Sequence, residues 1–334
     1  MTTSEQAGAA DAADQWVTYR PNIKVLDCTV RDGGLINDHQ FNDDLVRAVY
    51  ETNVAAGIDY MEFGYKASKD IYSPDKFGPW KFCEEGDLRR IVGENDTDLK
   101  IAVMADAGRT EYETAILPRE QSVIDCVRVA CYIHQIPLAI DMVKDAHAKG
   151  YETMLQLMAV SIVNRDEIEA ALEIVAASPA AGVYIVDSFG ALYSEQVRDL
   201  TCMYVKAMEG TGKDVGMHAH NNQQLAFANT VEAIVNGANR VDATLAGIGR
   251  GAGNCAMELI VGFLHNPKFK MRPVLECTRD HFVPLRDAIN WGYSIPYALT
   301  GQLNRHPRSA IEWIDGDTPD DYLAFHDSLL EEES

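Results

Sequence analysis

The sequence predicts a (β/α)8 TIM barrel followed by a small C-terminal helical extension. From Ile23 onward, short apolar runs alternate with amphipathic segments eight times. Strands that alternate with helices pair in parallel through right-handed crossovers. Eight such units in about 240 residues match the length of this barrel. A doubly wound sheet would also alternate, but it usually has fewer strands, so the barrel is the preferred prediction.

The apolar runs and the segments between them define the expected elements. The strands are expected at 23–30, 60–65, 99–105, 126–132, 152–159, 182–186, 214–220 and 240–245. The helices are expected at 42–56, 87–93, 119–123, 137–149, 165–177, 194–209, 223–236 and 255–265. Several helices should end at glycines, which commonly adopt the left-handed conformation after a helix.

Three regions follow from this alternation. Residues 1–21 are rich in Ala, Asp and Gln and predict a disordered lead that is neither a signal nor a transit peptide. Residues 22–268 form the predicted catalytic barrel. Residues 269–334 read as a helical extension, with helices at 274–288 and 319–330 and an acidic tail.

Composition excludes several classes of protein. The 334 residues are 47% hydrophobic and 24% charged, which is ordinary for a globular protein. A formal net charge of −22 argues against a nucleic-acid partner or an anionic membrane surface. The seven cysteines are scattered without a CxxC pair, as expected for reduced thiols. With no apolar run long enough to span a bilayer, we expect a cytoplasmic protein.

The stretch from Gly216 to Asn222, Gly-Met-His-Ala-His-Asn-Asn, holds the clearest chemical pattern. His218 and His220 are two positions apart on a predicted strand, so both project to the same face. Imidazole is the commonest metal-ligating side chain, and this spacing suits two ligands of one ion. Two unremarkable surface histidines would give the same pattern, so other ligands are needed to decide.

Other strands supply those ligands, because active sites of these barrels lie at the carboxyl ends of the strands. Asp32 follows the first strand, and Asn254 lies in the loop after the eighth. In a closed barrel the first and seventh strands flank the eighth, so Asn254 is expected between Asp32 and the two histidines. Two nitrogens, a carboxylate oxygen and an amide oxygen suit a divalent ion, with Mn²⁺ preferred over Mg²⁺, Co²⁺ or Zn²⁺.

Three separated motifs then reveal a family resemblance. They are Leu26 to Gly33 (Leu-Asp-Cys-Thr-Val-Arg-Asp-Gly), the His-x-His-Asn of His218–Asn221, and Arg240 to Asn254. Together they resemble the metal-dependent lyase and synthase superfamily that includes 4-hydroxy-2-oxovalerate aldolase, hydroxymethylglutaryl-CoA lyase and isopropylmalate synthase. The similarity covers residues 23–265 and is closest to the hydroxy-oxovalerate aldolase branch.

The resemblance implies roles for individual residues. Asp32, His218 and His220 match the metal ligands, and Asn254 matches a ligand of the lyase branch. Arg31 matches an arginine that hydrogen-bonds the keto or enolate oxygen. The remaining expected site residues are Glu62, matching a polar neighbour of that arginine; Asp187, matching an aspartate that lines the pocket; and Tyr132, Gly249 and Lys66 as further substrate contacts.

One departure from the family concerns the general base. The aldolases have a histidine two residues after Arg-Asp-Gly, and here Leu35 stands there. His39, Tyr65, Asp106 and Tyr132 are alternative proton acceptors. Cys255 follows the glycine-rich loop and reads as a small buried residue. That loop lacks a GxGxxG, which argues against nucleotide binding.

The loop from Lys66 to Glu85 combines four lysines with aromatic residues. In so acidic a protein, this segment could be a lid that binds a carboxylate or phosphate of the substrate. A solvated loop with a few packing aromatics explains the same composition.

The predicted function is divalent-metal-dependent cleavage or formation of a C–C bond beside a 2-oxo acid, through a pyruvate-type enolate. Substrates of the 4-hydroxy-2-oxo acid class are expected. The alternatives are an acyl-CoA-dependent Claisen-type synthase or lyase, a metal-dependent hydrolase, and a non-catalytic metal-binding barrel. We expect a homodimer. A dehydrogenase partner is an alternative, although the extension does not clearly match the segment that binds one in the aldolase branch.

Overall fold

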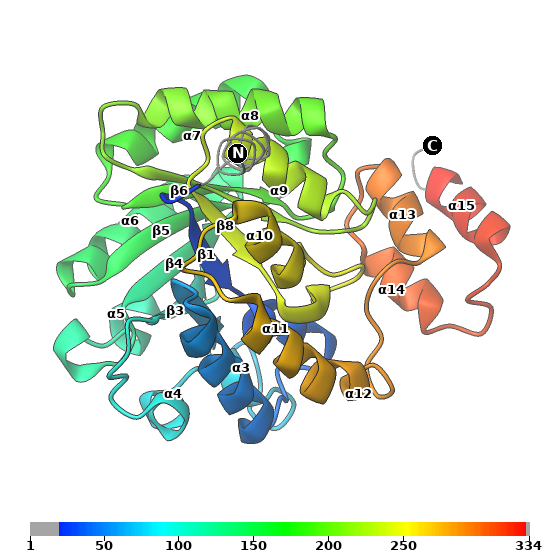
Figure 1. The fold of residues 1–334 in the computed structure, drawn as a ribbon. Helices are drawn as coiled ribbons and strands as arrows, with labels where there is room; N and C mark the ends of the chain where they lie inside the picture. The colour runs from blue at the N-terminus through cyan, green and yellow to red at the C-terminus, as the bar shows by residue number, and fades with distance from the viewer. Residues whose placement is uncertain (1–19, 332–334) are drawn as a thin grey trace, which may run out of the picture.

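The computed structural model describes residues 20–331 and contains a closed barrel of eight parallel strands (Figure 1). Each strand pairs with its neighbours in sequence, and β8 pairs with β1 to close the ring. The strands are β1 (Lys24–Asp27), β2 (Tyr60–Tyr65), β3 (Lys100–Asp106), β4 (Cys126–Cys131), β5 (Glu152–Leu157), β6 (Gly182–Asp187), β7 (Asp214–Ala219) and β8 (Arg240–Ala243). The predicted barrel is confirmed.

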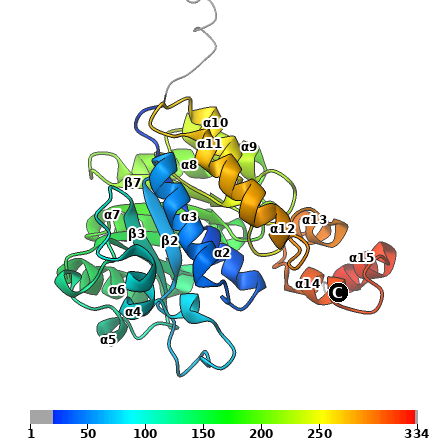
Figure 2. The same ribbon diagram turned by 60° about the horizontal axis from the view of Figure 1, so that its bottom comes forward.

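Helices cover the outside of the barrel, as both views show (Figures 1 and 2). They are α3 (Asp43–Ala56), α4 (Glu85–Val92), α5 (Tyr112–Ala115), α6 (Ile136–Ala148), α7 (Arg165–Ala177), α8 (Ser194–Met208), α9 (Ala226–Val235), α10 (Met257–Leu264) and α11 (Met271–Cys277). α11 packs against α3, so this start of the predicted extension covers the barrel wall. The helix expected at 119–123 is a single 3-10 turn, Arg119–Gln121.

The side chains of β7 explain how the barrel presents its polar groups. Val215 and Met217 are buried in the core shared with the helices, and the residues between them face the barrel interior. Gly216 is one of these, and a Cβ there would lie 2.4 Å from the ring of Tyr184. His218, two residues on, therefore points into the barrel above Tyr184.

The first turn differs from the sequence prediction, which continued the strand to Val30. β1 ends at Asp27, and Thr29–Gly33 forms the short helix α2. The Asp27 carboxylate accepts the Thr29 N–H at 2.6 Å, and the Asp32 N–H bonds the Cys28 carbonyl at 2.8 Å. These bonds start a helical turn, which carries Arg31 and Asp32 at the barrel mouth.

The C-terminal helices α12 (Val283–Leu285), α13 (Ile295–Gln302), α14 (Arg308–Ile314) and α15 (Tyr322–Glu331) follow the barrel. The last three group together on one side (Figures 1 and 2). Ala310 of α14 and Phe325 and Leu329 of α15 form a small core, against which Tyr297 and Leu299 of α13 pack. The chain before α14 reaches the barrel, because the Asn304 side chain donates to the Ser161 carbonyl at 2.8 Å.

Two expectations concern the ends of the chain. The disordered lead was assigned to 1–21, of which 1–19 lie outside the described residues, as do 332–334 of the acidic tail. The boundary at 268 between barrel and extension stays a prediction. Among the described helices, none combines the length and the apolar character needed to cross a bilayer.

Candidate metal centre and active site

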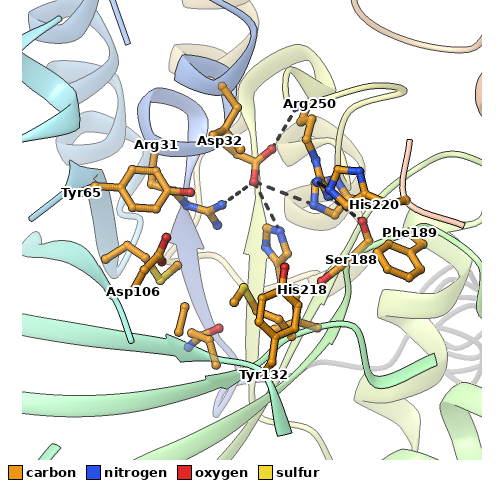
Figure 3. Close-up of a pocket in the computed structure, with 17 residues that line it drawn as sticks. Arg31, Asp32, Tyr65, Asp106, Tyr132, Ser188, Phe189, His218, His220 and Arg250 are labelled. Atoms are coloured by element: carbon orange, nitrogen blue, oxygen red, sulfur yellow. Dashed lines mark hydrogen bonds and ion pairs between the residues drawn. The ribbon is translucent and has the colours of Figure 1, made fainter. Parts of the chain in front are cut away.

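A cavity of about 100 Å³ lies at the carboxyl ends of the strands (Figure 3). Arg31 and Asp32 enter it from α2, and His218 and His220 enter it from the end of β7. Tyr132 lies in its wall, as expected for a substrate contact. The barrel therefore brings together residues that are almost 190 positions apart in the sequence.

Asp32, His218 and His220 form a group that could hold a metal ion. One ligand atom from each of the three lies within 4.8 Å of the others, and all three side chains are buried. The Asp32 Oδ2 atom is 3.6 Å from His218 Nε2 and 3.9 Å from His220 Nε2. Figure 3 shows the carboxylate of Asp32 between the two rings and Arg31. The predicted ligands thus converge.

The charge states of Asp32 and His220 suit a cation. Burial raises the pKa of Asp32, but Arg31 and the two histidines outweigh it and hold the pKa well below its usual range. Burial holds the pKa of His220 well below its ordinary value despite Asp32, so this ring is neutral. Neutral imidazole and ionised carboxylate are the ligating forms of these side chains.

Asn254 is placed beside this group by the loop after β8. Its backbone bridges to His220, and its Nδ2 atom donates to the Ile248 carbonyl at 3.1 Å. Its Oδ1 atom is buried without a hydrogen-bond partner among the described residues. An orphaned amide oxygen is costly unless a ligand satisfies it. The donor set therefore fits a divalent cation.

Gly249 and Arg250, in the loop after β8, fix the position of the Asp32 carboxylate. A Cβ on Gly249 would lie 2.0 Å from Asn254 Nδ2 and 2.7 Å from Asp32 Oδ1, so only glycine fits. The Arg250 N–H then donates to Asp32 Oδ1 at 3.0 Å. Gly249 thus supports a ligand by close backbone approach, whereas the sequence placed it as a substrate contact.

A ring of buried charges continues below the cavity. Glu62 Oε2 accepts from Arg31 Nε at 2.7 Å and from Arg128 Nη1 at 2.8 Å. Arg128 Nη2 donates to Asp242 at 2.5 Å, and Asp242 bonds His218 Nδ1 at 2.9 Å. Glu62, Arg128, His218 and Asp242 face the barrel interior by strand alternation. Glu62 is thereby a positioning residue for Arg31, since it does not line the cavity.

Asp242 and Arg128 were not singled out from the sequence. Asp242 fixes the orientation of His218 and directs Nε2 toward Asp32, as carboxylates behind metal-ligating histidines do. Burial lowers the pKa of His218, but the bonds to Asp242 and Asp32 outweigh it and raise the pKa. A signal was available, because Arg128 and Asp242 are charged residues at inward positions of apolar strands.

Two predicted site residues lie elsewhere. The carboxylate of Asp187 accepts the N–H groups of Ala191 at 3.0 Å and Leu192 at 3.2 Å, so it caps the loop after β6 and does not line the cavity. Burial, opposed by these bonds, raises its pKa to about 6. Lys66 is buried and donates to the Cys83 carbonyl at 2.7 Å, away from the cavity. Both expectations are corrected.

Three of the four candidate proton acceptors line the cavity. Tyr65, Asp106 and Tyr132 line the cavity together with Leu35, whereas His39 lines only the adjoining outer space. Burial, aided by Lys81 and Arg31, lowers the pKa of His39 to about 3. Burial raises the pKa of Asp106, and its side chain has no hydrogen bond or ion pair among the described residues. Asp106 lies on the Tyr65 and Arg31 side of the cavity (Figure 3).

Comparisons with known proteins show the family to which the chain is similar. The HMGL-like family matches residues 22–279. An oxaloacetate decarboxylase of Mycobacterium tuberculosis is 34% identical over 250 residues, which are 74% of this chain and 71% of that protein. A 4-hydroxy-2-oxovalerate aldolase of Rhodococcus erythropolis is 30% identical over 245 residues, 72% of this chain and 68% of that protein.

Solved structures share the fold. The N-terminal domain of a candidate aldolase from Bacteroides vulgatus superposes with a TM-score of 0.74 at 27% identity, over 90% of this chain and 100% of that one. A hydroxymethylglutaryl-CoA lyase from Pseudomonas aeruginosa gives a TM-score of 0.63 at 15% identity, over 79% of this chain and 94% of that one. The second likeness concerns the fold alone.

Proposed function

The chain belongs to the HMGL-like family, and we propose that it is a divalent-metal-dependent aldolase that cleaves or forms the C–C bond of a 4-hydroxy-2-oxo acid. The observation that carries this proposal is the buried Asp32, His218 and His220 group beside Arg31. Relatives named 4-hydroxy-2-oxovalerate aldolase support the substrate class. The mixed nitrogen and oxygen ligands favour Mn²⁺.

The proposed cation would be held by Asp32, His218 and His220, with the Asn254 oxygen as a further ligand. When bound, it supplies a Lewis acid for the negative charge that develops on the 2-oxo oxygen. Asp242 and Glu62 are positioning residues. They orient His218 and Arg31 and need no rearrangement during the reaction.

Arg31 binds the oxygen on which charge develops. Its Nε and Nη1 atoms are engaged by Glu62 and Asp32. Its Nη2 atom makes no hydrogen bond to any side chain or backbone of the described residues, and Arg31 lines the cavity. This N–H group is available to the 2-oxo oxygen, where a fixed donor favours the enolate over the ketone.

Asp106 is the proton acceptor that we propose in place of the absent histidine. As a carboxylate it takes the proton of the C4 hydroxyl while the C3–C4 bond breaks, which gives an aldehyde and the enolate of pyruvate. The same proton then returns to C3, and pyruvate forms. Burial raises the pKa of Asp106, and a higher pKa makes a carboxylate a stronger base at neutral pH.

Pyruvate release from 4-hydroxy-2-oxopentanoate tests the proposal. Asp106→Asn should lower kcat by about 10²- to 10⁴-fold, the usual contribution of a general base, with bound metal unchanged. Asp141→Asn, on the exposed face of α6, is the control and should retain full activity. An Asp106→Asn enzyme with wild-type kcat would refute the role of Asp106.

Decarboxylation of a 3-carboxy-2-oxo acid is a second candidate. Leu35 lines the cavity where the aldolases carry their base, and loss of carbon dioxide needs no proton acceptor for a hydroxyl group. The oxaloacetate decarboxylase relative points the same way. Pyruvate release from oxaloacetate that persists in Asp106→Asn, with no cleavage of 4-hydroxy-2-oxopentanoate by the wild type, would favour this candidate. A homodimer and a dehydrogenase partner stay predictions.

A further inference from the structure

A second cavity of about 330 Å³ adjoins the first at the barrel mouth. Both are lined by Tyr65, Asp106, Tyr132, Arg250 and His306. Figure 3 shows the first four of these around the inner cavity. A substrate whose 2-oxo acid end lies beside Asp32 can therefore extend into this outer cavity, where the far end of its aldehyde half would lie.

Four cationic side chains line the outer cavity: Lys81, Arg109, Arg250 and Arg308. None of them has an ion pair within 4.0 Å among the described residues. Two carboxyl groups share the wall, and one of these, Asp38, faces Lys76 at 4.0 Å. The local excess of positive charge contrasts with a chain that has 51 acidic and 29 basic residues.

Lys81 is the most informative of the four. It is only 5% exposed, and its Nζ atom lies 4.1 Å from the ring centre of Tyr72 and 4.2 Å from that of Tyr65. Its Nζ atom makes no hydrogen bond to the described residues, although Asp38 and Asp106 line the same cavity. The rings hold the ammonium at the cavity without a hydrogen-bonded anion, and an anion in the cavity would add charge-assisted hydrogen bonds to it.

The C-terminal extension completes this wall. His306 and Arg308 lie at the start of α14, and the His306 ring faces two donors. Arg250 Nη1 is 2.7 Å from its Nε2, and the Arg308 N–H is 3.1 Å from its Nδ1. A neutral imidazole has one acceptor nitrogen, so only one of these donors is satisfied. A bound anion would accept from the other.

We propose that the outer cavity binds a terminal phosphate or carboxylate on the aldehyde half of the substrate. This inference rests on the proposed aldolase function and narrows its substrate class. Lys81 and Arg308 bind the anionic group, and Tyr72 and Phe77 hold the lysine in place. Charge-assisted hydrogen bonds of this kind distinguish an anionic substrate from a neutral one of similar size.

Condensation of pyruvate with matched aldehydes tests this inference. The pairs are glyceraldehyde with glyceraldehyde 3-phosphate, and butanal with 4-oxobutanoate. The wild-type enzyme should use one or both anionic members with a kcat/KM about tenfold or more above that of the neutral partner. The pair with the larger ratio identifies phosphate or carboxylate as the preferred group.

Two variants and one control locate the effect. Lys81→Met and Arg308→Gln should each reduce the anionic-to-neutral ratio by about tenfold, mainly through KM. Arg308 is exposed, so its variant folds even if Lys81→Met does not. Arg272→Gln, whose side chain is 86% exposed on α11, should leave the ratio unchanged.

Equal use of both members of each pair, or equal losses on both in the variants, would overturn the inference. Exchange of the pyruvate methyl protons with D₂O needs no aldehyde and reports on the proposed function separately. Exchange without any anionic preference would refute the outer site alone. Absence of both exchange and condensation would refute the aldolase function and this inference with it.

Discussion

Asp32 keeps a negative charge in a fully buried position because four surrounding groups favour it. Arg31 forms an ion pair with one oxygen, the Arg250 N–H donates to the other, and both histidines lie nearby. A buried charge persists only when such partners compensate its lost hydration. At the residue scale, the centre is therefore organised for a cation before one binds.

Removal of one ligand tests this organisation. His220→Ala should lower bound Mn²⁺ and kcat by more than the roughly 10- to 100-fold that loss of a residue supporting a ligand costs. Asp32→Asn should act in the same direction. Metal content by mass spectrometry and turnover should fall together, while His147→Ala, on α6 outside the cavity, should change neither. A metal-free His220→Ala enzyme with full activity would contradict the mechanism.

At this scale, the sequence predicted which side chains lie together where residue spacing along a strand determines their direction. His218 and His220 share a face because strand side chains alternate, and the structure brings both to Asp32. The prediction failed for Asp187 and Lys66, because their partners are backbone groups of nearby loops. A sequence does not show which backbone N–H or carbonyl groups a loop leaves free, so those side chains could not be placed in advance.

At the scale of single elements, the loop after β8 positions the residues of the site. Gly249 lets the loop pass against Asp32 and Asn254, and its neighbour Arg250 fixes Asp32 through its backbone N–H. The periodicity of the sequence predicted the strands and most helices, with ends within a few residues of those in the structure. The helical turn α2 was not predicted, because the Asp27 carboxylate that accepts the Thr29 N–H lies inside an otherwise apolar strand pattern.

Gly249→Ala tests the role of this loop. The added Cβ would overlap Asn254 and crowd Asp32, so the loop must move. We expect Mn²⁺ affinity to fall by about 10- to 100-fold, with circular dichroism unchanged. Gly86→Ala in α4, where a Cβ meets no atom within 4 Å, is the matched control. Wild-type Mn²⁺ affinity in Gly249→Ala would show that the loop does not support the ligands.

At the scale of the whole molecule, the barrel and the C-terminal extension both contribute side chains to the opening of the barrel. The barrel supplies the proposed metal ligands, and the extension supplies His306 and Arg308 to the cavities. The alternation of elements predicted the barrel but not this contribution. Which side chains of an extension reach a barrel depends on contacts such as that of Asn304 with Ser161, which no local pattern encodes.

Metal binding should stabilise the whole fold, since the proposed ligands come from both ends of the barrel sequence. A ligand that binds only the native state adds about 2.7 kcal/mol when its free concentration is 100 times its Kd. Thermal unfolding should therefore shift to higher temperature with added Mn²⁺ and return with chelator. His220→Ala should show no such shift, and an equal shift in this variant would place the ion elsewhere.

The most direct measurement follows proton exchange at the methyl group of pyruvate in D₂O by NMR. With Mn²⁺ present we predict exchange by the wild-type enzyme, because the site should form the enolate without any aldehyde. Chelator should abolish this exchange, and so should His220→Ala. Metal-bound wild-type enzyme that leaves the methyl protons unexchanged, or exchange that persists in chelated His220→Ala, would contradict the central claim that Asp32, His218 and His220 build an enolate-forming metal centre.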